Sequence, residues 1–147
     1  MMHLYGARRG MAAPVAVLAL ASGLMAESYL SQLKTVRNPG KRSERALKLA
    51  DSAFDNARGL YKKGEIQKGD AALDQMNEAL TACLQSAEIA NKPKYYKKAE
   101  LNVAKLQRQL KWLLNDLDVW NRGGAKAASK KMDLIHNQLL AGVMRRR

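Results

Sequence analysis

The stretch VAKLQRQLKWLLNDLDVW, residues 103–120, decides the fold. Its large apolar residues follow one another at alternating steps of three and four positions: Val103, Leu106, Leu110, Leu113, Leu117 and Trp120. Such a seam predicts a helix that packs closely against one or more partner helices. We expect this helix to end at Asn121-Arg122-Gly123-Gly124, because Gly and Asn interrupt helices.

The same spacing recurs on both sides of this stretch. Apolar stripes predict helices over about residues 41–63 and 66–91, separated by a turn at Gly64–Glu65. Further stripes predict a short helix over residues 27–36 and a last helix over about residues 125–144. No run of alternating residues suggests a strand. The sequence therefore predicts an all-α fold, a small up-and-down bundle of three long helices plus shorter terminal helices.

Residues 1–26 differ in character from the rest of the chain. Arg8 and Arg9 precede an uncharged, largely apolar stretch, residues 10–26, which ends in small residues just before Glu27. This order is typical of a secretory signal peptide. The alternatives are an uncleaved membrane anchor, since the stretch is near the lower length limit for a span, and a buried N-terminal helix, which Pro14 disfavours. We expect export to the periplasm or beyond, with residues 27–147 forming a single domain.

Positive charge is concentrated in the second half of that domain. The chain has 26 Lys and Arg against 13 Asp and Glu, a formal net charge of +13. Residues 27–91 carry 10 basic and 9 acidic side chains, whereas residues 92–147 carry 14 basic and 4 acidic ones. The excess therefore belongs to the last two predicted helices and their connections.

The densest run of cations is a candidate polyanion-binding site: Lys92, Lys94, Lys97, Lys98, Lys105, Arg108 and Lys111. A field of this sign attracts anionic lipid, acidic envelope polymers or nucleic acid. Tyr95 and Tyr96 lie inside the run, Trp112 lies off the apolar seam, and such aromatic side chains can stack on bases. The alternative is a solvated Lys-rich face, with both tyrosines packed under the preceding hairpin.

Two resemblances accompany these patterns. The segment Leu60–Leu73 resembles the turn region of a tetratricopeptide-type hairpin, with Tyr61, Gly64, Gly69 and Leu73 in the fitting places, although the family's large aromatic residue and closing proline are not evident. More broadly, the order of parts is similar to a loose group of bacterial exported helical proteins, on three segments: residues 38–42, 93–100 and 136–140. The second resemblance implies export and a helical fold, and it supplies no activity or site.

Residues suited to catalysis are few. His136 is the only histidine after residue 26, and Cys83 lies on an apolar stripe, where a free thiol is usually a small buried hydrophobe. Two carboxylate pairs can act as acid/base couples or simply form surface ion pairs: Asp51 with Asp55, and Asp70 with Asp74. The sequence contains neither a paired-cysteine motif nor a Gly-rich phosphate loop. We therefore expect no enzyme activity, no cofactor and no metal site.

These observations leave two main functional hypotheses. The first is a non-enzymatic interaction or structural module of the cell envelope, with another envelope protein or an anionic surface as its partner. The alternative is polyanion binding through the Lys92–Lys111 region. A third hypothesis is self-association through the seam of residues 103–120, in which case Trp120→Ala is expected to weaken both assembly and folding. No small-molecule substrate is expected.

Overall fold

The computed structural model describes residues 30–145. The chain divides into two compact units, one ending at Thr35 and one beginning at Val36. The predicted signal peptide and residues 27–29 of the first predicted helix lie outside the described residues. In the first unit, residues 30–34 are helical, and the Thr35 hydroxyl donates a hydrogen bond of 2.8 Å to the carbonyl oxygen of Gln32.

The second unit is built from four long helices. They are α2 (Pro39–Lys62), α3 (Ile66–Ala90), α4 (Pro93–Asp116) and α5 (Gly123–Arg145), with a short 3-10 helix, η1 (Val119–Asn121), between the last two. Residues 30–145 contain no strand, so the all-α prediction is confirmed. The last helix has 23 residues and matches the others in length, so this unit has four long helices where the sequence predicts three.

Local sequence explains where these helices begin and end. The Asn38 side chain caps α2 by accepting a hydrogen bond of 3.1 Å from the Lys41 N–H, and Pro39 occupies the first turn, where its missing N–H has no cost. Gly64, with a φ of 77°, makes the turn into α3. Asn91 ends α3 with a φ of 53°, a conformation that Asn tolerates better than most residues, and Pro93 then begins α4.

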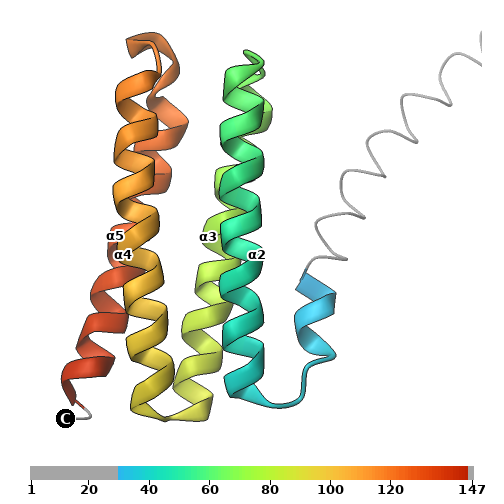
Figure 1. Cartoon of the computed structure of the whole chain (residues 1–147), viewed down its shortest axis with the longest axis vertical. Helices are drawn as coiled ribbons and strands as arrows, with labels where there is room; N and C mark the ends of the chain where they lie inside the picture. Colours follow the sequence, from blue (N-terminus) through green and yellow to red (C-terminus); the bar gives the residue numbers. More distant parts are fainter. Residues whose placement is uncertain (1–29, 146–147) are drawn as a thin grey trace, which may run out of the picture. The chain divides into compact units, whose positions relative to one another are not determined.

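Consecutive helices run in opposite directions and form two hairpins, α2–α3 and α4–α5 (Figure 1). The hairpins meet mainly through two further pairs, α3 with α5 and α2 with α4, and α3 makes a smaller contact with α4. The two main pairs are each parallel, because their members are two helices apart in the chain. The bundle therefore places α2 beside α4 rather than opposite it.

Small residues determine how closely the helices approach. Ala46, Ala50, Ala53 and Ala57 are all buried along α2, and α2 and α3 make the most extensive contact of any helix pair. Between α3 and α5, the Asn77 amide donates a hydrogen bond of 3.0 Å to the carbonyl oxygen of Ala128. The contact between α2 and α4 is much sparser, so the bundle is open along this pair.

One prediction of the seam is wrong. Trp120 is 92% exposed rather than buried, because α4 ends at Asp116 and the backbone becomes extended at Leu117. Asn, Asp and Val, which are poor helix formers, crowd the segment after Leu114, and acidic residues are unfavourable at a helix C-terminus. Arg122 stabilises the break by donating a hydrogen bond of 2.8 Å to the carbonyl oxygen of Leu117. Gly123 and Gly124, predicted as breakers, form the first turn of α5.

Candidate functional site

The seven predicted polyanion-binding residues all lie on α4 or at its start, but they face two directions. Lys98 and Lys105 point toward α2, where they form ion pairs with Glu44 at 3.5 Å and with Asp51 at 3.7 Å. Asp51 also accepts a hydrogen bond of 3.2 Å from the Asn102 amide. These two cations are therefore already engaged with carboxylates of the same chain.

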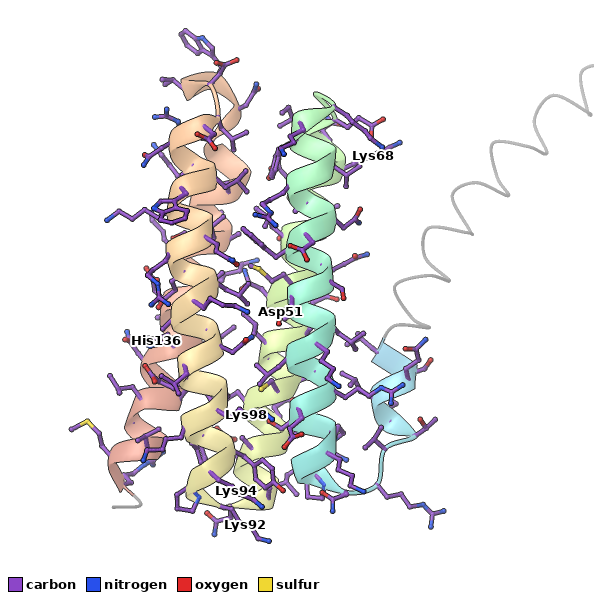
Figure 2. The ribbon with its side chains drawn as sticks, viewed as in Figure 1. Asp51, Lys68, Lys92, Lys94, Lys98 and His136 are labelled. Carbon is purple, nitrogen blue, oxygen red and sulfur yellow. The ribbon has the colours of Figure 1, made fainter. Side chains whose placement is uncertain are left out.

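The other five predicted cations are exposed: Lys92, Lys94, Lys97, Arg108 and Lys111. None of them forms an ion pair within residues 30–145. Lys92 and Lys94 lie where α4 begins, at one end of the bundle (Figure 2), and the Lys94 ammonium lies 5.0 Å from the centroid of the Tyr95 ring. By helical spacing, the remaining three follow one strip of α4 that faces away from α2.

The two tyrosines within the run both pack against other helices. Tyr96 is 1% exposed and its ring packs against Gly142 of α5. The Tyr95 ring packs against Gly40, in the first turn of α2. Packing under the preceding hairpin is therefore confirmed for Tyr95, whereas Tyr96 is buried against α5 instead. Trp112 behaves differently, since it lies off the seam and remains 71% exposed.

Two hollows lie between α2 and α4. Because the two helices are parallel, residues in contact across them have a constant separation in the sequence. The ion pairs Glu44–Lys98 and Asp51–Lys105 each join residues 54 positions apart. Both hollows open along this line. We name them the Asp51 hollow and the Trp112 hollow, and together they form the α2/α4 groove.

The Asp51 hollow has a volume of about 350 Å³ and lies between the first halves of α2 and α4. Its walls include Glu44, Lys48 and Asp51 from α2 and Lys98, Leu101 and Lys105 from α4. Leu101 is 66% exposed at its rim. Lys48 is exposed and has no ion-pair partner among residues 30–145, unlike the two lysines of α4 across the hollow.

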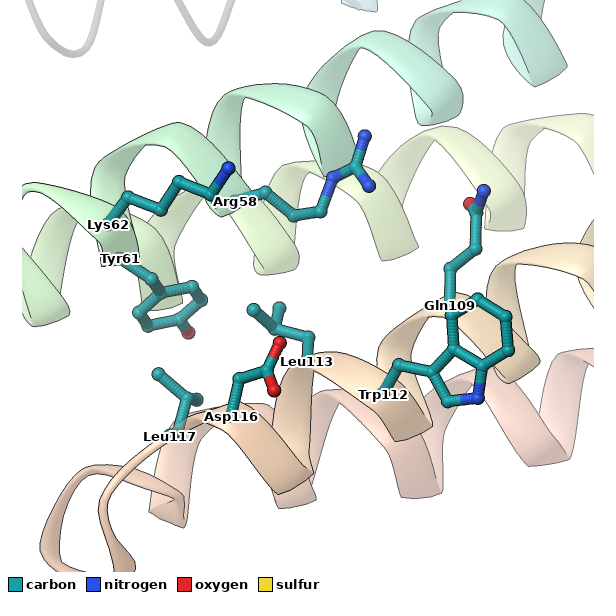
Figure 3. Close-up of a pocket in the computed structure, with 8 residues that line it drawn as sticks. All are labelled: Arg58, Tyr61, Lys62, Gln109, Trp112, Leu113, Asp116 and Leu117. Carbon is teal, nitrogen blue, oxygen red and sulfur yellow. The ribbon is translucent and has the colours of Figure 1, made fainter.

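The Trp112 hollow, of about 330 Å³, lies nearer the ends of α2 and α4. It is lined by Arg58, Tyr61 and Lys62 from α2 and by Trp112, Leu113 and Asp116 from α4. Figure 3 shows Arg58 and Lys62 extending along the α2 side, with the indole of Trp112 on the α4 side. Arg58 pairs with Asp55 at 2.8 Å, whereas neither Lys62 nor Asp116 forms an ion pair within the described part of the chain.

The sequence alone does not predict this groove, because nothing in the local sequence around Lys48, Lys62 and Leu101 indicates that α2 and α4 lie side by side. A usable signal was present in Trp112 and Leu101, which are large apolar residues outside the helical seam. Such residues leave the core and point to a second surface.

The remaining candidate residues have structural partners. Asp55 forms an ion pair with Arg58, and Asp70 accepts a hydrogen bond from Tyr61. His136 Nε2 lies 2.9 Å from Glu100 Oε1, which joins α5 to α4. Asp133, the acid nearest to His136 in sequence, instead accepts a hydrogen bond of 2.7 Å from Gln107.

Cys83 is a buried thiol between α3 and α2. Its sulfur lies 3.3 Å from the Ser43 hydroxyl. Burial raises the pKa of Cys83 to about 11, against a smaller lowering by the hydrogen bond with Ser43. A thiol with this pKa is almost entirely protonated at neutral pH and is a poor nucleophile, so Cys83 serves packing, as its apolar stripe predicts.

Neither a membrane span nor a metal cluster is present among residues 30–145. No helix there is both long and apolar enough to cross a bilayer, and no group of three or more His, Cys, Asp and Glu side chains in that range is placed to hold a metal ion. No family model matches the chain, and neither a curated protein nor a solved structure is significantly similar to it.

Proposed function

We propose that the protein is an exported, non-enzymatic interaction module that binds a partner protein of the cell envelope through its α2/α4 groove. The observation that carries this proposal is the pair of large apolar side chains at the rim of the groove, Leu101 and Trp112, which are 66% and 71% exposed. Single apolar residues on a surface are ordinary, but large ones beside a hollow are typical of interaction sites.

Two further features support an interaction role. Trp is enriched among the residues that dominate binding energy at protein interfaces. The hollows of about 330 and 350 Å³ can each admit one or two side chains of a partner. The proposed export rests on the sequence of residues 1–26 and on the resemblance to exported helical proteins.

A photo-crosslinking experiment in the native host tests this proposal. The photoreactive residue p-benzoylphenylalanine is introduced at the position of Trp112 and, in a control protein, at that of Gln85, an exposed residue of α3. We expect a discrete cross-linked product from position 112 and none from position 85. Absence of a product at position 112, or the same product from both positions, would contradict binding at the groove.

The same preparation reports on export. Intact-mass measurement of the recovered protein is expected to place the N-terminus of the mature chain near Glu27. A chain that still begins at Met1 and is recovered from the cytosol contradicts the envelope location.

Polyanion binding is a second candidate function, favoured by the exposed cations of α4 that lack ion pairs among residues 30–145. Its test is binding to vesicles that contain phosphatidylglycerol, with phosphatidylcholine vesicles as the uncharged comparison. If Lys97, Arg108 and Lys111 neutralise lipid charge, replacing all three by Gln weakens binding and its salt dependence. Replacing Lys126, Lys130 and Lys131 of α5 by Gln removes the same amount of charge from a different helix. An equal loss of vesicle binding in this control variant would argue against a site on α4.

A further inference from the structure

We propose that the partner segment bound in the α2/α4 groove is an acidic amphipathic helix. This inference rests on the proposed function, since it names the chemistry of the partner that the groove receives. Four residues carry the argument: Leu101 and Trp112 on the α4 rim, and Lys48 and Lys62 on the α2 rim.

The α4 rim offers two apolar contact points at helical spacing. Leu101 and Trp112 lie eleven residues apart, which is three turns of α4 or roughly 16 Å along its axis. Both side chains are exposed, and each lies beside a different hollow. A second helix aligned with the groove can meet both points with apolar residues that are themselves eleven positions apart.

The α2 rim offers two exposed lysine side chains. Lys48 and Lys62 lie fourteen residues apart on α2, four turns or about 21 Å, and each lines one of the hollows. Neither has an ion-pair partner within residues 30–145. Lys98 and Lys105 across the groove, by contrast, are paired with Glu44 and Asp51.

The Trp112 hollow also contains opposing charges. Asp116 lines it together with Lys62 and Arg58, and Arg58 forms an ion pair with Asp55. The unpaired Lys62 and Asp116 therefore lie at opposite walls, cation on α2 and carboxylate on α4. Lys62 on the α2 wall favours an acidic side chain of the partner, and Trp112 on the α4 wall favours an apolar one.

An α-helix satisfies these requirements better than a small ligand. The two hollows together span Glu44 to Lys62 on α2, about 27 Å at 1.5 Å per residue, so only an extended partner can occupy both at once. A helix laid in a groove presents anchors at i, i+3, i+4 and i+7 along one face. Its apolar face would cover Leu101 and Trp112, while Glu or Asp on the flank would pair with Lys48 and Lys62.

Binding of designed peptides to the full chain tests this inference. The probe is a fluorescently labelled peptide of about three heptads with Leu at the two core positions and Glu at the flanking positions. One control peptide carries Lys in place of every Glu, and another has the composition of the probe with its helical period broken. Fluorescence anisotropy measures the Kd of each peptide.

Matched protein variants locate the binding. We expect Trp112→Ala and Lys62→Gln each to raise the Kd of the acidic peptide by about fivefold or more, because they remove an anchor and a charge partner. Trp120→Ala and Lys63→Gln remove the same groups from exposed positions outside the groove. These two control variants should change the Kd by less than about twofold.

The outcomes separate this inference from the function on which it rests. Equal binding of the period-broken peptide, or equal losses with Lys62→Gln and Lys63→Gln, would show unspecific charge attraction and overturn the helical partner. Tighter binding of the Lys peptide would overturn the acidic partner. Either result leaves a cross-link at position 112 intact, whereas a missing cross-link refutes the interaction module itself.

Discussion

Gly142→Ala is expected to lower the free energy of unfolding by about 2 kcal/mol. Gly142 is buried on α5, and a methyl group at this position would overlap the ring of Tyr96. The ring is 1% exposed, so it cannot turn aside into solvent, and either α5 or the ring must move. Overpacking of this kind outweighs the gain of roughly 1 kcal/mol that Ala brings to a helix interior. Urea denaturation monitored by circular dichroism measures the change.

Gly59→Ala is the matched control for this prediction. Gly59 lies inside α2, and a methyl group there meets no other atom within 4 Å. The substitution should therefore stabilise the protein by about 0.5–1 kcal/mol, through helix propensity alone. In a Tyr96→Leu background, Gly142→Ala should become much less costly, because the two positions are coupled. If Gly142→Ala proves as stable as Gly59→Ala, the packing of α4 against α5 described above is incorrect.

The sequence predicts the helices well because each has an apolar stripe that survives in the bundle. Leu106 and Leu110 of the seam, for example, are buried as their spacing predicts. The turns before and after α3 are also marked in the sequence, by Gly64 and Asn91, which both adopt positive φ angles. Periodicity fails at Trp120 for a physical reason. The three- and four-residue spacing of apolar side chains continues past Leu117 to Trp120, but this spacing does not show that the backbone leaves the helix at Leu117.

The candidate site is harder to predict because it depends on which helices become neighbours. Up-and-down connectivity leaves open whether α2 lies beside α4 or diagonally across from it. Lys98 and Lys105 look like free cations in the sequence, yet carboxylates 54 positions away engage them. Exposure of Lys97 and Arg108, by contrast, follows from helical periodicity alone, since both lie opposite the buried seam.

The α2/α4 groove and the strip of exposed cations on α4, formed by Lys97, Arg108 and Lys111, are adjacent but chemically distinct. The groove contains carboxylates, paired cations and apolar rims, so its selectivity depends on shape and on the position of charge. The strip consists of exposed cations without ion pairs in the described residues, so its attraction for anions is strongly screened by salt. Comparing Lys62→Gln with Lys97→Gln therefore distinguishes recognition at the groove from general attraction by a basic surface.

Asp70→Ala is expected to destabilise the bundle by about 2 kcal/mol, the value of a hydrogen bond to a charged acceptor. Asp70 begins the second turn of α3 and accepts a hydrogen bond of 2.5 Å from the Tyr61 hydroxyl of α2. The carboxylate also packs against Gly124 in the first turn of α5, where a negative charge is favourable. One side chain therefore connects three helices at this end of the bundle. Asp74→Ala, an exposed neighbour on α3, should change stability by less than about 0.5 kcal/mol.

Two adjacent glycines test the contact with α5 separately. A methyl group on Gly124 would overlap the Asp70 carboxylate, whereas one on Gly123 meets no other atom within 4 Å. Asp70 can rotate away only by giving up its hydrogen bond with Tyr61, so Gly124→Ala should cost about 1–2 kcal/mol. Gly123→Ala should be neutral or slightly stabilising. If Gly124→Ala costs the same in a Tyr61→Phe background, the hydrogen bond does not hold the carboxylate in place.

The same contact predicts how stability depends on alkaline pH. Burial, the hydrogen bond to Asp70 and the negative charges of Asp70 and Asp74 raise the pKa of Tyr61 well above its ordinary value of 10.0. The folded protein therefore retains the phenol proton at a pH where the unfolded chain has released it. This contribution to stability is fully present below about pH 10 and is lost progressively as the pH rises beyond that value. Tyr61→Phe should flatten this decline in urea denaturation at alkaline pH, while lysine deprotonation affects both proteins alike. Equal declines in the two proteins would mean that the Tyr61 hydroxyl is open to solvent, and that Asp70 does not connect α2 to α3.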